Sequence, residues 1–130
     1  MVKTGTKVER LDATGDGVKV KVNGPAGVET LVAEQVLVAI GFKTNSENLG
    51  LEAISVTIER GFIQVDDRMQ TNVPGVWAIG DVTGKFMLAH VASAQGIVCA
   101  ENLANHPTVK LDYAAMPAAT YSHPRWRRLV

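Results

Sequence analysis

One carboxylate near the middle of the chain is the first candidate for chemistry. Residues 76–79 (VWAI) form an apolar run without polar alternation, and Gly80 and Asp81 follow it directly. Such a run is typical of a strand buried on both faces of a parallel sheet. Ligands of open α/β sheets bind at the carboxyl ends of strands, and a glycine lets a ligand approach the backbone. Asp81 is therefore predicted to bind a polar ligand group. The pattern leaves open an ordinary strand–turn–helix in which Asp81 only caps the loop.

A helix is predicted after the polar loop that follows Asp81. It is expected to begin at about Met87 or Leu88 and to end near Asn105, before a His-Pro pair that stops it. The first amide groups of a helix lack acceptors within the helix. They would point toward the space above Asp81, where they suit an electron-rich ligand edge.

Small residues recur at helical spacing along this predicted helix. They are Ala89, Ser93, Gly96 and Ala100. Small side chains permit close approach, so this face is predicted to pack tightly against a sheet or a cofactor, with simple packing as the alternative. Cys99 on the same helix is interpreted as a buried small hydrophobic residue and not as a nucleophile.

The first part of the chain has the pattern of a three-stranded antiparallel meander. Strands are predicted at residues 6–12, 18–22 and 29–33, separated by glycine-rich turns, and residues 18–22 alternate strictly between Val and Lys. A continuous apolar run at 36–40 is predicted to be a buried strand that ends at Gly41. A short strand is expected at 62–65.

Composition excludes several classes of partner. Lysine plus arginine and aspartate plus glutamate both number 13, so no net charge favours nucleic acid or an acidic surface. No apolar run is long enough to span a membrane, and the first residues lack the apolar core of a signal peptide. The single cysteine, Cys99, cannot form an intrachain disulfide, and no Cys/His cluster has the spacing of a metal site. A cytoplasmic protein without membrane, nucleic-acid or metal partners is expected.

Residues 71–81 (TNVPGVWAIGD) carry a family resemblance. They resemble the second flavin-binding motif of the FAD/NAD-linked disulfide oxidoreductases. Residues 87–90 (MLAH) resemble the dihydrolipoamide dehydrogenase branch of that family. The similarity runs from Thr4 to Pro124 and covers nearly the whole chain.

The resemblance implies a fold class and a division of the chain. The chain is expected to be an α/β (α+β) fragment, with parts of FAD/NAD(P)-binding Rossmann-like domains and the antiparallel meander. Residues 1–45 would be the end of the NAD-binding domain, and residues 46–110 the end of the FAD-binding domain. Residues 111–130 would be a linker and the first strand, at 117–121, of a truncated interface domain.

The resemblance also implies roles for individual residues. Asp81 would accept a hydrogen bond from the ribityl chain of FAD. A helix N-terminus would present its amides to the flavin; its residues are Met87, Leu88, Ala89 and His90. Gly41 and Val8 would lie near NAD, although a tight turn alone also accounts for Gly41. Asp66, in the charged turn before the motif, is expected to be solvated and of little consequence.

The chain departs from the family pattern at several positions. Phe42 and Thr44 replace the usual Arg and Pro, which weakens the case for local contacts there. Gln95 replaces a common Glu, so one charge is missing. The similarity stops at residues 125–130 (RWRRLV), where truncation or a frame change is the simplest explanation.

Several parts of a complete flavoenzyme are absent from the sequence. No Gly-x-Gly-x-x-Gly motif, Cys-x-x-x-x-Cys pair or C-terminal His-Glu pair occurs. The chain is thus expected to be a piece of a flavoenzyme that oxidises protein-bound dihydrolipoamide with NAD, a homodimer served by a lipoyl-bearing protein. Two alternatives stay open: a piece of mercuric or glutathione reductase, and an inert folded or self-associating fragment.

Overall fold

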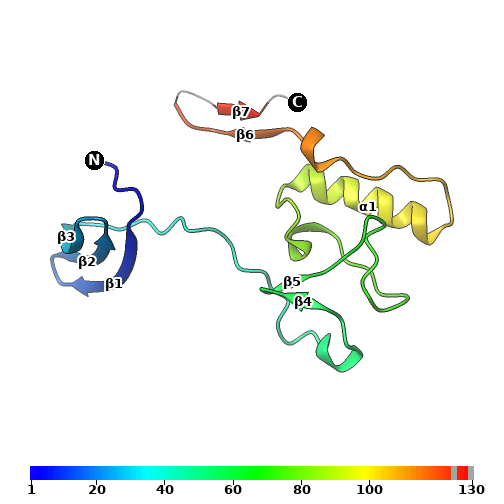
Figure 1. Ribbon diagram of the computed structural model, residues 1–130, viewed down its shortest axis with the longest axis horizontal. Coiled ribbons are helices and arrows are strands. Elements are labelled where there is room, and N and C mark those ends of the chain that lie inside the picture. The colour runs from blue at the N-terminus through cyan, green and yellow to red at the C-terminus, as the bar shows by residue number, and fades with distance from the viewer. Residues whose placement is uncertain (124–125, 129–130) are drawn as a thin grey trace. The chain divides into compact units, whose positions relative to one another are not determined.

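The computed structural model of the chain describes residues 1–123 and the backbone of residues 126–128 (Figure 1). It divides into two compact units, Met1–Gly41 and Phe42–Val130. The first unit contains an antiparallel sheet of three strands: β1 (Lys7–Thr14), β2 (Gly17–Gly24) and β3 (Gly27–Ala33). The predicted meander is therefore confirmed, with strands somewhat longer than the pattern indicated.

Alternation along β2 gives this sheet one apolar and one polar face. Val20 lies between Leu11 of β1 and Leu31 of β3, and its side chain is buried. Lys19 and Lys21 point to the opposite face, as the period of a strand requires.

The prediction of a buried strand at residues 36–40 is wrong. The segment has no regular structure, and its side chains are exposed, with Leu37 at 91% and Ile40 at 92%. A strand needs a neighbour for its backbone groups, and no described strand pairs with this segment. An apolar run alone does not identify that neighbour.

The second unit contains a 3-10 helix, η1 (Glu52–Ile54), followed by a short hairpin of β4 (Ile58–Glu59) and β5 (Phe62–Ile63). Arg60 and Gly61 form its turn with φ of 52° and 85°. Positive φ at both central residues is typical of a type I′ turn, which matches the twist of paired strands. The predicted strand at 62–65 is confirmed for its first two residues.

The prediction of a buried strand at residues 76–79 is also wrong. Trp77 makes a single antiparallel bridge to Gln70, and the Ala78 amide donates to Met69 at 3.1 Å. Ala78 is buried in a cluster with Val56 and Ile63. The run therefore contributes to the core as one side of a tight loop, because none of the described strands pairs with it.

A second apolar cluster joins this loop to the helix. Met69 is 1% exposed and packs with Val98 and Cys99, although its φ is 67°, a left-handed value that is rare for residues other than glycine. Asp66 stabilises this turn: its Oδ1 accepts hydrogen bonds from the amides of Arg68 at 2.8 Å and Gln70 at 2.9 Å. The expectation that Asp66 is merely solvated is wrong.

Helix α1 (Ala89–Leu103) forms where the sequence predicts it (Figure 1). Its buried residues are Val91, Gln95, Val98 and Cys99. This spacing gives one face that packs on the rest of the unit.

The small-residue face of α1 is largely uncovered in the described structure. Ser93 and Ala100 are exposed, and only Gly96 lies close to another segment, with its Cβ position 3.6 Å from Cδ1 of Ile79. The prediction of close packing is thus confirmed at Gly96. At Ser93 and Ala100 no described segment lies against the helix, so packing against a cofactor stays a prediction there.

The chain after α1 contains a short 3-10 helix, η3 (Tyr113–Ala115), inside the predicted linker. Strand β6 (Ala118–Thr120) lies within the predicted strand and pairs antiparallel with β7 (Trp126–Arg128). Part of the divergent stretch, residues 125, 129 and 130, lies outside the described residues. No helix in the described part of the chain is both long and apolar enough to cross a membrane.

Candidate functional site

Asp81 lies in a tight turn of 3-10 helix, η2 (Gly80–Thr83). Gly80 has a φ of 78°, which most side chains would oppose. The Thr83 hydroxyl donates to the Gly80 carbonyl at 2.8 Å, and the Gly84 amide donates to the Asp81 carbonyl at 3.0 Å. The backbone around Asp81 is therefore held on both sides.

The carboxylate of Asp81 is exposed and takes no part in holding this turn. Within residues 1–123 it has no hydrogen bond and no ion pair. A capping role would require a loop amide that donates to this carboxylate, and the turn supplies none. Both carboxylate oxygens are thus free to accept hydrogen bonds from a ligand.

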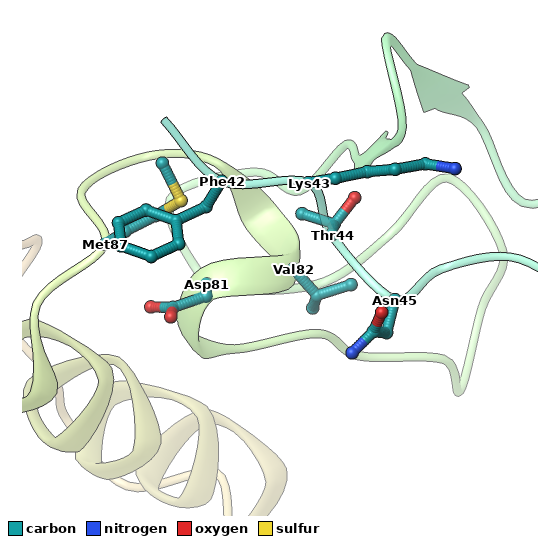
Figure 2. Close-up of a pocket in the computed structure, with 7 residues that line it drawn as sticks. All are labelled: Phe42, Lys43, Thr44, Asn45, Asp81, Val82 and Met87. Carbon is teal, nitrogen blue, oxygen red and sulfur yellow. The ribbon is translucent and has the colours of Figure 1, made fainter. Parts of the chain in front are cut away.

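A cavity of about 290 Å³ opens beside this carboxylate (Figure 2). Figure 2 shows the segment 42–45 running past η2, so that side chains of both segments face the same space. The lining residues are Phe42, Lys43, Thr44, Asn45, Asp81, Val82 and Met87. The cavity combines apolar side chains with amide, hydroxyl and carboxylate groups. The Lys43 side chain extends away from Asp81 (Figure 2), and its ammonium pairs with Glu47 at 2.7 Å.

Hydrogen bonds attach the 42–45 segment to the β4–β5 hairpin. The hydroxyls of Thr44 and Ser46 donate to the Gly61 carbonyl, at 2.5 Å and 2.6 Å. Ser46 is buried, so this anchor is shielded from water. These hydrogen bonds therefore fix the position of the segment that lines the cavity.

The N-terminus of α1 leaves backbone donors without acceptors. The amides of Val91 and Ala92 both donate to the Leu88 carbonyl at 3.0 Å. Leu88 provides no side-chain cap, and the amides of Ala89 and His90 have no acceptor among the described residues. Together with the helix dipole, free amides of this kind favour electron-rich groups.

The structure brings together some of the predicted site residues. Asp81 and Met87 line the same cavity. Leu88, Ala89 and His90 follow Met87 at the start of α1 and are not part of the lining. The His90 ring hydrogen-bonds through Nε2 to the Pro117 carbonyl at 3.0 Å.

The two residues predicted to lie near NAD belong to the first unit. Val8 is in β1 and its side chain is 52% exposed. Gly41 is exposed at the end of that unit with a φ of 112°, so its conformation requires glycine.

The sequence prediction missed most of the cavity wall. Phe42 and Thr44 appeared only as departures from the family pattern, yet both line the cavity with Lys43 and Asn45. One signal was available: Phe42 is a large aromatic residue in a polar segment. Phe42 and Asp81 are far apart in sequence, so their proximity in the fold could not be predicted.

Cys99 does not belong to the cavity. It lies on the buried face of α1, and burial raises the pKa of its thiol above the ordinary value. A raised pKa lowers the fraction of reactive thiolate at neutral pH. The interpretation of Cys99 as a buried small hydrophobic residue is confirmed.

The chain is similar to known proteins over most of its length. The family of pyridine nucleotide-disulphide oxidoreductases matches residues 1–96. A dihydrolipoyl dehydrogenase of Mycobacterium leprae is 46% identical over 125 residues, which are 95% of this chain and 27% of that protein. The chain thus spans about a quarter of that relative's length.

Solved structures show the same fold. LpdA from Mycobacterium tuberculosis superposes with a TM-score of 0.82 at 28% identity, over 92% of this chain and 26% of that one. The flavoprotein disulfide reductase RclA from Escherichia coli gives a TM-score of 0.74 at 25% identity, over 93% of this chain and 27% of that one. These likenesses confirm the expected α/β class with its antiparallel meander. Because the matching region covers most of the chain, the chain belongs to the pyridine nucleotide-disulphide oxidoreductase family.

Proposed function

We propose that this chain is part of an NAD-dependent dihydrolipoyl dehydrogenase and supplies contacts to its FAD. One observation carries the proposal: an unpartnered carboxylate, Asp81, lines a cavity just before a helix whose first amides lack acceptors. The similarity to a relative with that name supports the choice of reaction. Dihydrolipoamide and NAD would be converted to lipoamide and NADH.

The donor and acceptor groups of the site fit part of a flavin dinucleotide. Sites for drug-sized ligands enclose about 300–1,000 Å³. The cavity of about 290 Å³ is just below that range, so it suits a portion of FAD. The remaining part of the cofactor would lie against other parts of the enzyme.

Each site group has a defined task in this proposal. Asp81 accepts a hydrogen bond from a ribityl hydroxyl and orients the chain of the cofactor. The free amides of Ala89 and His90 stabilise negative charge at the N1–C2=O edge of the flavin. Bound FAD supplies the redox chemistry, while the protein contributes position and electrostatics. Met87 contributes an apolar contact, and Leu88 is the N-cap residue that precedes α1.

The assignment of NAD contacts to Val8 and Gly41 belongs to the same proposal. Gly41 presents backbone without a side chain, so a ligand can approach it closely. The predicted division gives residues 1–45 to NAD, residues 46–110 to FAD and residues 111–130 to the start of the subunit interface. Residues 42–45 line the cavity beside Asp81, so in this proposal they contact FAD. A complete enzyme of this type would work in the cytoplasm as a homodimer with a lipoyl-bearing protein.

The chain by itself is expected to be catalytically inactive. Dithiol oxidation of this kind needs a pair of cysteines, and the sequence contains one. We therefore expect no lipoamide-dependent NADH turnover from purified chain that is free of host flavoenzymes. Turnover above the buffer control that persists after repurification would contradict this expectation.

Cofactor binding can be tested on the same purified chain. FAD is titrated into ¹⁵N-labelled protein, and amide shifts are followed at Asp81, Ala89 and His90. Saturable shifts at these positions, lost in Asp81→Ala, support the proposal. Shifts elsewhere only, or none with wild-type protein, favour the alternative of an inert folded chain. In an intact enzyme that carries this stretch, turnover is compared with lipoamide, glutathione disulfide and Hg²⁺ as substrates. The preferred substrate distinguishes a dihydrolipoyl dehydrogenase from glutathione reductase and mercuric reductase.

A further inference from the structure

A buried amide side chain lies directly beneath the turn that carries Asp81. Gln95 is on the inner face of α1 and is 1% exposed. Burial of an unpaired amide group is costly, so a buried Gln is expected to have specific partners. Its two partners come from segments far from each other in sequence.

The first partner is the backbone of the Asp81 turn. The Gly80 amide donates to Oε1 of Gln95 at 2.6 Å. The second is the Tyr113 hydroxyl, which accepts a hydrogen bond from Nε2 of Gln95 at 3.0 Å. A backbone amide can only donate, so Oε1 must face Gly80 and the orientation of the Gln95 amide group follows.

Tyr113 is itself held in place. Asp112 caps η3, because its Oδ1 accepts from the Ala114 amide at 2.9 Å. Gln95 therefore connects the Asp81 turn, the helix and the segment after the helix through two hydrogen bonds. Among the described residues, no other side chain bonds to the Gly80 amide.

We propose that Gln95 is a positioning residue for Asp81. Its Oε1 fixes the Gly80 amide, and the turn that begins there sets the direction of the Asp81 carboxylate toward the cavity. This inference rests on the proposed function in one respect, namely that Asp81 contacts the ligand. The positioning itself is a property of the chain without ligand.

Glutamine and glutamate differ at this position in the hydrogen bond to Tyr113. A glutamate carboxylate would accept from both partners, so the hydroxyl of Tyr113 would have to donate to it. Glutamine donates instead, and the hydroxyl hydrogen stays available. Both side chains accept from Gly80, so Gln95→Glu is a conservative variant for the turn.

The test measures amide hydrogen exchange in the full chain at pH 7 by NMR. In Gln95→Met, which preserves length and removes both bonds, exchange at Gly80 is expected to accelerate about tenfold, because the hydrogen bond of its amide is lost. Exchange at Val98 in the helix reports global stability in the same spectra. Ser93→Ala, on the exposed side of the same helix, is the matched control and should change neither site.

Two milder variants keep the test decisive if Gln95→Met unfolds. Gln95→Glu should restore protection at Gly80, and Tyr113→Phe should give an acceleration smaller than that of Gln95→Met. Equal acceleration at Gly80 and Val98 in every variant, or unchanged exchange at Gly80 in Gln95→Met, would overturn the proposal. FAD titration of the same samples tests the proposed function separately. Absence of FAD binding by the wild-type protein would refute the proposed function, and the exchange result would still decide the role of Gln95.

Discussion

Asp66 and Asp81 both lie in turns, but they have different roles. Asp66 accepts two backbone hydrogen bonds and holds the turn before Met69. Asp81 has no partner among the described residues and faces a cavity. The sequence predicted a ligand contact for Asp81 but not the structural role of Asp66, because that role depends on which backbone amides the turn directs at the carboxylate. The structure assigns the structural role to Asp66 and leaves Asp81 available for a ligand.

This contrast predicts opposite effects of two alanine substitutions. Asp66→Ala should lower the free energy of unfolding by about 1 kcal/mol, the usual loss for a capping carboxylate. Asp81→Ala should leave it within about 0.5 kcal/mol, as for other surface changes. In an intact enzyme that carries this stretch, Asp81→Ala should weaken FAD binding by about one to two decades. Denaturant melts and FAD dissociation, measured in both variants, check this; a destabilised Asp81→Ala with unchanged FAD affinity contradicts it.

Cys99 is predicted to react slowly with a thiol reagent. Burial limits access and raises the pKa of the thiol, so the thiolate forms only at higher pH than in free cysteine. At pH 8 the labelling rate should be about tenfold or more below that of free cysteine. It should rise with pH and approach the free rate in denaturant. Equal rates for folded and denatured chain at pH 8 would show that the thiol is open to solvent.

Among the elements, those defined by local pattern were predicted and those defined by a distant partner were not. Strict Val/Lys alternation in β2 marks a strand with one apolar face, and helical spacing marks α1. The apolar runs at 36–40 and 76–79 look alike in sequence. One is exposed without a neighbour, and the other makes a single bridge at Trp77. Runs of this kind need tertiary context before they form strands.

The same distinction applies to the candidate site: contacts within one motif could be predicted, and contacts between distant segments could not. Asp81 and Met87 lie within one motif, so their proximity could be predicted. Phe42 reaches the cavity because two hydroxyls anchor its segment to Gly61, a contact between residues far apart in sequence. Gln95 was visible only as a departure from a pattern, since its function depends on burial and on Gly80.

The loop between η2 and α1 is predicted to tolerate no side chain at Gly84. Gly84 has a φ of 66°, and a Cβ there would lie 2.5 Å from Cδ1 of Phe62. Gly84→Ala should combine a left-handed strain of about 1–2 kcal/mol with overpacking of about 1–3 kcal/mol. Gly75→Ala is the matched control, because its φ is 82° but no atom lies within 4 Å. Thermal melts should show the larger loss at Gly84; equal losses would mean that Phe62 moves aside freely.

At the scale of the whole molecule, the chain consists of two units joined by an exposed segment. Limited proteolysis should cut that segment first, because proteases need exposed backbone without regular structure. A protease that cleaves after large apolar residues should act at Leu37 or Phe42, which are 91% and 84% exposed. Mass spectrometry of early products checks this. A first cut within β1–β3 or α1 would contradict the division into units.

The exposed run at residues 36–40 has a consequence for the life of this chain in a cell. Its five side chains, Val-Leu-Val-Ala-Ile, are apolar, β-prone and uncharged, and all of them face solvent. Chaperones and proteases act on chains that display such segments, and exposed apolar strands promote aggregation. We therefore expect the steady-state level of this chain to depend mainly on how quickly residues 36–40 pair with another strand. The stability of the core around α1 should matter less.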